Sequence, residues 1–164
     1  MDKNFKIFSG DSNPHLAQKI CNHLEVPLGD VFKHTFPSGE LFARFNENIR
    51  GEDVFIIQGA GDKSANDNFM QLMILADAAR RASASRITAV MPMAFYSRQD
   101  RKNKGREPIS FKLMLDMLAA GGVHRIVTMD LHSPQTQGFT NLPFDHLAFE
   151  PVLINYIKSH YTDL

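Results

Sequence analysis

Two side chains that can bind metal or phosphate follow a short apolar run towards the end of the chain. Residues 126–129 have the β-branched and apolar composition of a buried strand, and Asp130 and His132 come just after it. Residues two apart on an extended backbone point the same way, and open α/β sheets bind ligands at the carboxyl ends of their strands. A carboxylate beside a neutral imidazole could hold a divalent cation next to a nucleotide. The alternative is a loop aspartate that caps the next turn beside a surface histidine.

The most basic stretch of the chain follows the preceding predicted strand. Within residues 97–106, Asp100 is the one acid among five cations. The cations are Arg98, Arg101, Lys102, Lys104 and Arg106. Guanidinium and ammonium groups bind phosphate oxygens through charge-assisted hydrogen bonds, so this density favours a polyphosphate ligand. A solvated basic loop, or one that touches RNA, is the competing interpretation.

Several familiar site motifs are absent from the sequence. Residues 59–64 (GAGDKS) lack the spacing and the Gly-Lys-Ser/Thr ending of a P-loop, and they lack the third glycine of the dinucleotide fingerprint. We therefore interpret them as a tight strand-to-helix connection. No Gly-x-Ser-x-Gly or His-Glu-x-x-His pattern indicates a hydrolase. Of the seven histidines, His132 has an acidic partner at ligand spacing after a strand, and the others are expected to be surface or structural residues.

The composition is that of an ordinary single globular domain. The 164 residues carry 18 Lys plus Arg against 18 Asp plus Glu, so net charge attracts the chain neither to nucleic acid nor to a membrane. The one cysteine, Cys21, excludes an intramolecular disulfide and a cysteine-cage zinc site, and it is predicted to be a small core residue. No secretory signal and no run of about 20 apolar residues is present, which predicts a cytoplasmic protein.

Strands that alternate with helices predict one α/β domain over residues 1–164, with a mostly parallel sheet flanked by helices. Strands are predicted at residues 5–8, 31–36, 41–45, 53–58, 87–92 and 126–129. Helices are predicted to start at Pro14 after Asn13, after a cap at Asn66 or Asp67, at Pro108 and at Pro151. The two strands within residues 31–45 are expected to form a short antiparallel addition. The stretch from residue 130 to Asp145 is expected to be a loop.

The predicted helices carry apolar stripes, and the predicted loops share one edge of the sheet. The stripe of the helix at Pro108 consists of Ile109, Leu113, Met114, Met117 and Leu118. The stripe of the last helix consists of Val152, Leu153, Tyr156 and Ile157. Loops at residues 59–65, 94–106 and 130–139 leave the carboxyl ends of the strongest strands, so we expect them to meet in one crevice.

A series of short stretches resembles, in order and spacing, one known family: ribose-phosphate pyrophosphokinase, also called phosphoribosyl pyrophosphate synthetase. They lie at residues 8–10, 36–40, 46–51, 66–68, 81–90, 96–101, 108–109, 128–132 and 137–139. The resemblance implies transfer of the β,γ-diphosphoryl group of ATP to the 1-hydroxyl of ribose 5-phosphate, giving phosphoribosyl pyrophosphate and AMP for nucleotide biosynthesis. It also implies a type I phosphoribosyltransferase-like fold, a requirement for Mg²⁺, activation by phosphate, and assembly through homodimers, commonly into hexamers.

The resemblance further implies roles for individual residues. The ATP-binding segment matches Arg98, Gln99, Asp100, Arg101, Lys102 and His132. The adenine-contacting turn, which a neighbouring subunit supplies in the family, matches Phe36, Ser38, Gly39 and Glu40. Metal-side positions match Asp130, His132 and Asp145, and regulatory phosphate positions match Arg50 and Arg106. Because Mg²⁺ prefers oxygen ligands, we expect His132 to act mainly on phosphate oxygens, with Asp130 nearer the metal.

The matching stretches cover the family's amino-terminal half alone, so we interpret residues 1–164 as the ATP-binding domain of a longer enzyme whose second domain is absent from this chain. No residue of this half is assigned a catalytic role, and the 164 residues alone are expected to be inactive. A non-catalytic regulatory or nucleotide-binding homologue is the alternative; Ser38 and Asn141 depart from the family pattern and favour it, whereas residues 98–101 and 130–132 disfavour it. A phosphoribosyltransferase and a basic RNA-binding module are less well supported, because the pyrophosphate-product loop signature and an aromatic stacking pattern are absent.

Overall fold

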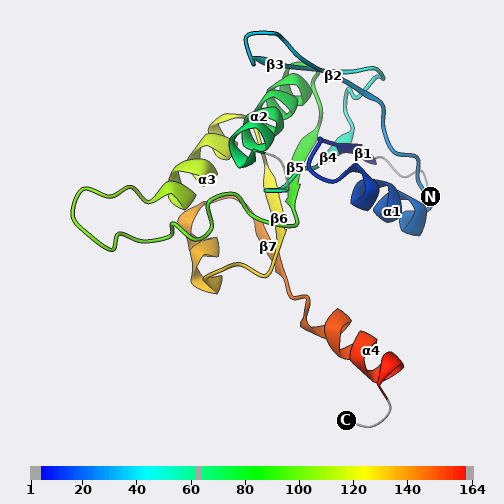
Figure 1. Ribbon diagram of the computed structural model, residues 1–164. Helices are drawn as coiled ribbons and strands as arrows, with labels where there is room; N and C mark the ends of the chain where they lie inside the picture. The colour runs from blue at the N-terminus through cyan, green and yellow to red at the C-terminus, as the bar shows by residue number, and fades with distance from the viewer. Residues whose placement is uncertain (1–4, 62–63, 162–164) are drawn as a thin grey trace.

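Parallel strands form the central sheet of the computed structural model, which describes residues 5–61 and 64–161 (Figure 1). The strands are β1 (Phe5–Ser9), β4 (Asp53–Ile57), β5 (Arg86–Met91), β6 (Arg125–Met129) and β7 (Phe144–Leu147). They lie side by side in the order β1-β4-β5-β6-β7. Side chains from the strand centres, such as Val54 and Ala89, are fully buried, as is usual for a parallel sheet. Because all the strands run the same way, their carboxyl ends lie along one edge.

Helices pack on both faces of this sheet, because alternate side chains of a strand point to opposite faces. The helices are α1 (Pro14–Leu24), α2 (Ala65–Arg81), α3 (Ser110–Ala120) and α4 (Glu150–His160). α2 and α3 bury the face that carries Phe8 and Ile56. α1 lies on the other face, where Cys21 belongs to the same buried cluster as Ile7. Figure 1 shows α2 and α3 together on one side of the sheet and α1 on the other. The predicted fold class is confirmed.

A separate antiparallel pair, β2 (Val31–Thr35) with β3 (Leu41–Phe45), confirms the predicted addition. β3 packs against α2, and the hairpin extends beyond that helix in Figure 1. The turn closes where the Phe36 N–H donates to the Glu40 carbonyl at 2.9 Å. Gly39 has a φ of +88° in this turn, which glycine adopts without the steric cost that a Cβ brings.

The predicted strand bounds agree with the observed ones to within one residue at either end. α1 begins at Pro14 as predicted, and the Leu16 N–H donates to Asn13 Oδ1 at 3.0 Å. Cys21 is fully buried, and burial raises the pKa of its thiol. Within residues 5–61 and 64–161, no helix is long and apolar enough to cross a membrane.

The predicted cap of α2 is wrong. The helix begins at Ala65, and Ser64 is its cap, because the Asp67 N–H donates to Ser64 Oγ at 3.3 Å. Asn66 and Asp67 therefore lie within the first turn. Serine caps a helix as well as asparagine or aspartate does, so the three candidates could not be separated by residue type. Residues 62–63 of the preceding loop lie outside the described residues.

The predicted start of α3 at Pro108 is also wrong, since the helix begins at Ser110. The Phe111 N–H donates to the Gln99 carbonyl at 3.2 Å, and the Ser110 hydroxyl donates to the Gln99 side-chain oxygen. The basic loop thus folds back and satisfies the first turn of the helix. This tertiary cap replaces the local one that the sequence led us to expect.

The buried face of α3 differs from the predicted stripe as well. Leu118 is buried as predicted, but Leu113 is 53% exposed. Phe111, Leu115 and Leu118, spaced four and three residues apart, form the apolar face. Most positions between 109 and 119 are apolar, so residue spacing alone could not select the face that meets the sheet.

The stretch predicted to be a loop before Asp145 contains two regular elements. A short 3-10 helix, η1 (Pro134–Phe139), precedes the edge strand β7. β7 has the sequence FDHL, in which no apolar alternation marks a strand. Asp145 therefore lies within the sheet, where it pairs in register with Val127 of β6.

α4 begins at Glu150, one residue before the predicted start, and no described side chain of this helix is buried. Val152 is 54% exposed and Tyr156 is 55% exposed, so the predicted apolar stripe contacts water. Figure 1 shows α4 beyond the end of β7 and away from the sheet. Among the described residues, the helix therefore lacks the tertiary packing that stabilises α2 and α3.

Candidate functional site

An open pocket of about 320 Å³ lies where the loops after β5 and β6 meet. Its lining residues are Pro92, Met93, Ala94, Ser97, Arg98, Met129, Asp130 and His132. Three predicted ligand-binding side chains, Arg98, Asp130 and His132, therefore share one pocket at the carboxyl edge of the sheet. A guanidinium, an imidazole and a carboxylate in one pocket can hold a phosphate chain together with its cation.

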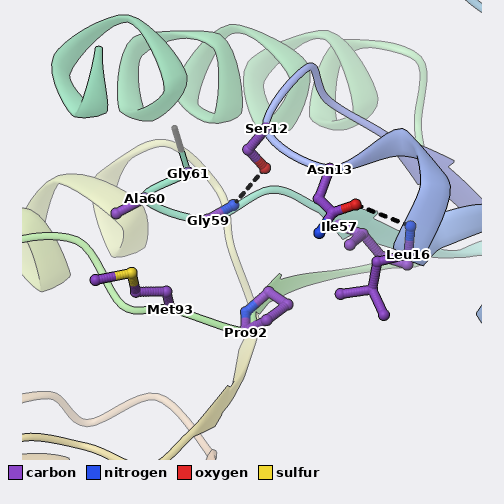
Figure 2. A pocket seen from close by; sticks show the side chains of 9 residues that line it. All are labelled: Ser12, Asn13, Leu16, Ile57, Gly59, Ala60, Gly61, Pro92 and Met93. Atoms are coloured by element: carbon purple, nitrogen blue, oxygen red, sulfur yellow. Dashed lines mark hydrogen bonds between the residues drawn. The ribbon is translucent and has the colours of Figure 1, made fainter. Parts of the chain in front are cut away.

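A second pocket adjoins the first (Figure 2). Pro92 and Met93 line both pockets, so the two are neighbours. The β1–α1 loop and residues 59–61 build the opposite side, and Figure 2 shows the Gly59 N–H donating to Ser12 Oγ, a bond of 3.0 Å. The loops after β4, β5 and β6 thus converge on one edge, as the sequence predicts.

The buried side chain of Gln58 fixes the loops beside this second pocket. Gln58 Oε1 accepts a hydrogen bond from the Ser12 N–H at 2.9 Å, and Gln58 Nε2 donates to Gln71 Oε1 on α2 at 2.8 Å. Gly10 approaches so closely that a Cβ built on it would lie 2.2 Å from Gln58 Oε1. The β1–α1 loop therefore has a fixed position relative to β4 and α2. Residue spacing gives no signal for this network, because its members are far apart in the chain.

Asp130 caps a distant turn instead of the next turn of the chain, which the alternative interpretation predicts. Its N–H donates to the Leu147 carbonyl at 3.0 Å, and its Oδ1 accepts from the Phe149 N–H at 3.1 Å, in the segment after β7. It also lines the pocket. Both roles are compatible, because a carboxylate has two acceptor oxygens. Its φ of +44° lies in the left-handed region, which is uncommon for a residue with a Cβ.

Asp100 of the basic loop lies beside Ser133 of the loop after β6. The Ser133 hydroxyl, together with the nearby Arg101 and His132 side chains, holds the pKa of the Asp100 carboxyl below its ordinary value. The carboxylate is therefore ionised at neutral pH. Ser133 is absent from the predicted site residues, although it directly follows His132, because its partner is visible only in the folded chain.

The other residues of the predicted ATP-binding segment divide into exposed cations and one structural amide. Arg98, Arg101 and Lys102 are exposed, and Arg98 is the one among them that lines the described pocket. Gln99 instead directs its side-chain oxygen to Ser110 at the start of α3. The cations of this segment are thus exposed to solvent, and Gln99 attaches the loop to the start of α3.

The predicted adenine-contacting turn lies at the tip of the β2–β3 hairpin. Phe36 is 45% exposed, and its ring meets that of His34 edge-on with 4.9 Å between centroids. The Ser38 hydroxyl donates to Glu40 Oε2 at 2.7 Å. Neither of the two pockets described above is lined by Phe36, Ser38, Gly39 or Glu40. The described chain does not bring this turn to the pocket that Arg98, Asp130 and His132 line.

Asp145 does not join Asp130 and His132. Arg125 Nε lies 2.5 Å from Asp145 Oδ2, and Arg125 Nη2 lies 2.9 Å from Asp145 Oδ1. These hydrogen bonds hold the pKa of the Asp145 carboxyl below its ordinary value. In the parts of the chain that the structure describes, no three histidine, cysteine, aspartate or glutamate residues form a group that could hold a metal ion.

Arg50 and Arg106, the predicted regulatory phosphate pair, lie at opposite edges of the sheet. Arg50 is exposed in the turn before β4, at the amino edge, where its N–H donates to Asn48 Oδ1 at 3.1 Å. Arg106 is exposed in the loop after β5, at the carboxyl edge, with a φ of +69°. The structure does not bring the two guanidinium groups together within one chain.

Known proteins match most of this chain. Residues 5–122 match a family described as the N-terminal domain of ribose phosphate pyrophosphokinase. The ribose-phosphate pyrophosphokinases of Agrobacterium fabrum and Caldanaerobacter subterraneus subsp. tengcongensis are 49% identical over 156 residues and 50% identical over 151 residues. The matches cover 95% and 92% of this chain, and 50% and 48% of the relatives. The crystal structure of phosphoribosylpyrophosphate synthetase from Mycobacterium smegmatis has a TM-score of 0.93 at 42% identity, covering 97% of this chain and 53% of that one. The chain thus spans about half the length of the relatives it matches.

Proposed function

Because this chain belongs to the ribose-phosphate pyrophosphokinase family, we propose that it forms the amino-terminal, ATP-binding half of an enzyme that makes phosphoribosyl pyrophosphate. The observation that carries the proposal is the presence of Arg98, Asp130 and His132 in one pocket at the carboxyl edge of the sheet. The relatives named above are ribose-phosphate pyrophosphokinases, and their name specifies the transfer of a diphosphoryl group to ribose phosphate.

In the proposed reaction, O1 of ribose 5-phosphate forms a bond to the β-phosphorus of ATP. The bond from that phosphorus to the oxygen bridging the α- and β-phosphates breaks, AMP leaves with the bridging oxygen, and the 1-hydroxyl loses its proton. Catalysis of this kind of transfer consists largely of positioning and charge neutralisation. The Arg98 guanidinium can bind two phosphate oxygens side by side, and a ring N–H of His132 can donate to another.

The proposed cofactor is Mg²⁺, which neutralises the charge of the triphosphate when it is bound. Mg²⁺ commonly takes one or two protein carboxylates and completes its shell with phosphate oxygens and water. Asp130 fits this requirement, because the bond to Phe149 uses Oδ1 alone. His132 is assigned to phosphate oxygens, since an imidazole is a poor ligand for a hard cation. Asp145 could serve a metal only if it left Arg125.

The adenine contacts and the assembly are further parts of the proposal. Phe36, Ser38, Gly39 and Glu40 are exposed at the hairpin tip and lie outside the phosphate pocket, so a neighbouring copy is the proposed recipient of their contacts. A homodimer-based oligomer, with a hexamer as the full assembly, would supply that copy. Arg50 and Arg106 lie at opposite edges of the sheet, so a shared regulatory phosphate would need arginines from different chains.

The second half of the full-length protein is proposed to bind ribose 5-phosphate, because the chain covers about half of its relatives. The isolated 164 residues would then bind ATP without transferring its diphosphoryl group. A cytoplasmic location, where both substrates occur, belongs to the same proposal. A non-catalytic regulatory homologue remains the second candidate, since Gln99 of the ATP-binding segment is engaged at the start of α3.

The test is AMP formation by the full-length protein. We expect AMP to accumulate only when ATP, ribose 5-phosphate and Mg²⁺ are all present, and phosphoribosyl pyrophosphate to form in equal amount. Binding of ATP with no AMP under these conditions would support the regulatory homologue instead. Formation of ADP would show a single-phosphoryl kinase and overturn the proposed reaction.

A further inference from the structure

A histidine outside the phosphate pocket holds the backbone between Asp130 and His132. The Leu131 N–H donates to His146 Nε2 at 2.9 Å, from β6's carboxyl end to the edge strand β7. Leu131 is 7% exposed and belongs to the main hydrophobic core. With the Leu131 side chain directed inward and its amide held by His146, the residues on either side are presented to the pocket.

This hydrogen bond supports a strained stretch of backbone. Asp130 has a φ of +44°, a conformation that a residue with a Cβ keeps only where its surroundings hold it. Two further bonds hold it from the segment after β7, namely Asp130 N–H to the Leu147 carbonyl and Phe149 N–H to Asp130 Oδ1. Of these supports, the His146 ring is the one that a substitution can remove while the pocket residues stay unchanged.

We propose that His146 is a positioning residue of the phosphate site, which orients Asp130 and His132 by accepting the hydrogen bond of the amide between them. The inference rests on the function proposed above and extends it to a residue that touches no substrate. A neutral imidazole that accepts at Nε2 carries its proton on Nδ1, so the ring acts here through its lone pair. Partners that orient the groups of a metal or phosphate site typically contribute about 10-fold to 100-fold to affinity or activity.

The chain contains a matched control. His124 Nδ1 accepts a hydrogen bond from the Ile87 N–H at 3.1 Å, at the amino edge of the same sheet. His124→Leu thus removes the same kind of bond at the edge opposite the pocket. His146→Leu removes the acceptor beside the site, and His146→Gln places an amide oxygen at a similar reach.

The first measurement is the affinity for ATP and the rate of AMP formation in the full-length protein. We expect His146→Leu to lower the rate or the affinity about 10-fold, with His146→Gln and His124→Leu within about threefold of the original protein. Introduced into His132→Ala, His146→Leu should cause a smaller loss than in the original protein, because the part of its effect that acts through His132 is already gone and the part that acts through Asp130 remains. If His146 only stabilised the fold, His146→Leu would lower the rate or the affinity by the same factor in the original protein and in His132→Ala.

The second measurement needs no turnover. In amide NMR spectra, His146→Leu should speed hydrogen exchange of the Leu131 amide. In aromatic NMR spectra, it should shift the ring signals of His132, whereas His124→Leu should change neither quantity. An unchanged Leu131 amide, a His146→Leu protein as active as the original, or equal losses in the two backgrounds would each overturn the inference. If the original protein neither binds ATP nor forms AMP, the proposed function fails and the NMR comparison alone decides the positioning role. Should His146→Leu fail to fold, loss of activity in His146→Gln with an intact Leu131 amide would count against it.

Discussion

Arg125 and Asp145 face each other across the last two strands of the sheet and form two hydrogen bonds, at 2.5 and 2.9 Å. The Asp145 carboxylate, which is predicted to lie near the metal, thus binds the Arg125 guanidinium within the sheet. Both side chains remain more than one-third exposed, so water screens their attraction. Asp145 is therefore best described as half of an ion pair that organises β7 beside β6.

The pair predicts a pH dependence of stability. Hydrogen bonds from Arg125 lower the pKa of the Asp145 carboxyl in the folded state, so the pair stabilises the fold above the ordinary pKa of an aspartate. That contribution is lost as pH falls through the lowered pKa. We expect Asp145→Asn to reduce the melting temperature by no more than a few degrees at neutral pH, and to have no effect in strong acid. Thermal melts of both proteins across this pH range provide the measurement; an equal difference at every pH would contradict it.

Gly10 predicts a specific packing requirement. A Cβ at this position would lie 2.2 Å from Gln58 Oε1, so Gly10→Ala must displace a buried amide that bonds Ser12 and Gln71. We expect a loss of about 2–3 kcal/mol in the free energy of unfolding, measured by urea denaturation. Gly105→Ala is the matched control, because no atom lies within 4 Å of its Cβ position, and it should change stability by less than about 1 kcal/mol. Equal losses in the two variants would refute the requirement.

The proximity of Asp100 to Ser133 predicts a measurable titration. The Ser133 hydroxyl lowers the pKa of the Asp100 carboxyl, so Ser133→Ala should raise that pKa towards the ordinary aspartate value. Ser133→Thr keeps the hydroxyl and should leave the pKa low. Carbon NMR titration of the Asp100 carboxyl gives the answer directly. An unchanged pKa in Ser133→Ala would mean that the two loops are not joined in this way.

The strand pattern and the site at the end of β6 could be predicted because they depend on local features. Mostly apolar segments mark β4 and β5, and a carboxylate and an imidazole after β6 mark a place where such sheets bind ligands. Arg98, Asp130 and His132 meet in one pocket for the same reason. Parallel strands bring the residues that follow them to a single edge.

The features that escaped prediction depend on contacts between distant segments. β7 is a short edge strand with Asp145 and His146 inside it, and its pairing with β6 determines it more than its own residues do. The start of α3 is determined by Gln99, 11 residues earlier in the chain. His146 looks like any surface histidine in the sequence, and its bond to Leu131 is visible only in the fold. Residue type and spacing carry no signal for such pairs.

The pocket between the loops after β5 and β6 is the proposed binding site for the phosphates of ATP. Calorimetric titration of the full-length protein with ATP and Mg²⁺ measures this binding. Arg98→Ala and His132→Ala should each weaken binding about 10-fold or more, since each removes a hydrogen bond to a charged group, whereas Lys19→Ala, which removes an exposed cation on α1, should bind as the original does. ATP binding that is unchanged in both Arg98→Ala and His132→Ala would contradict the claim.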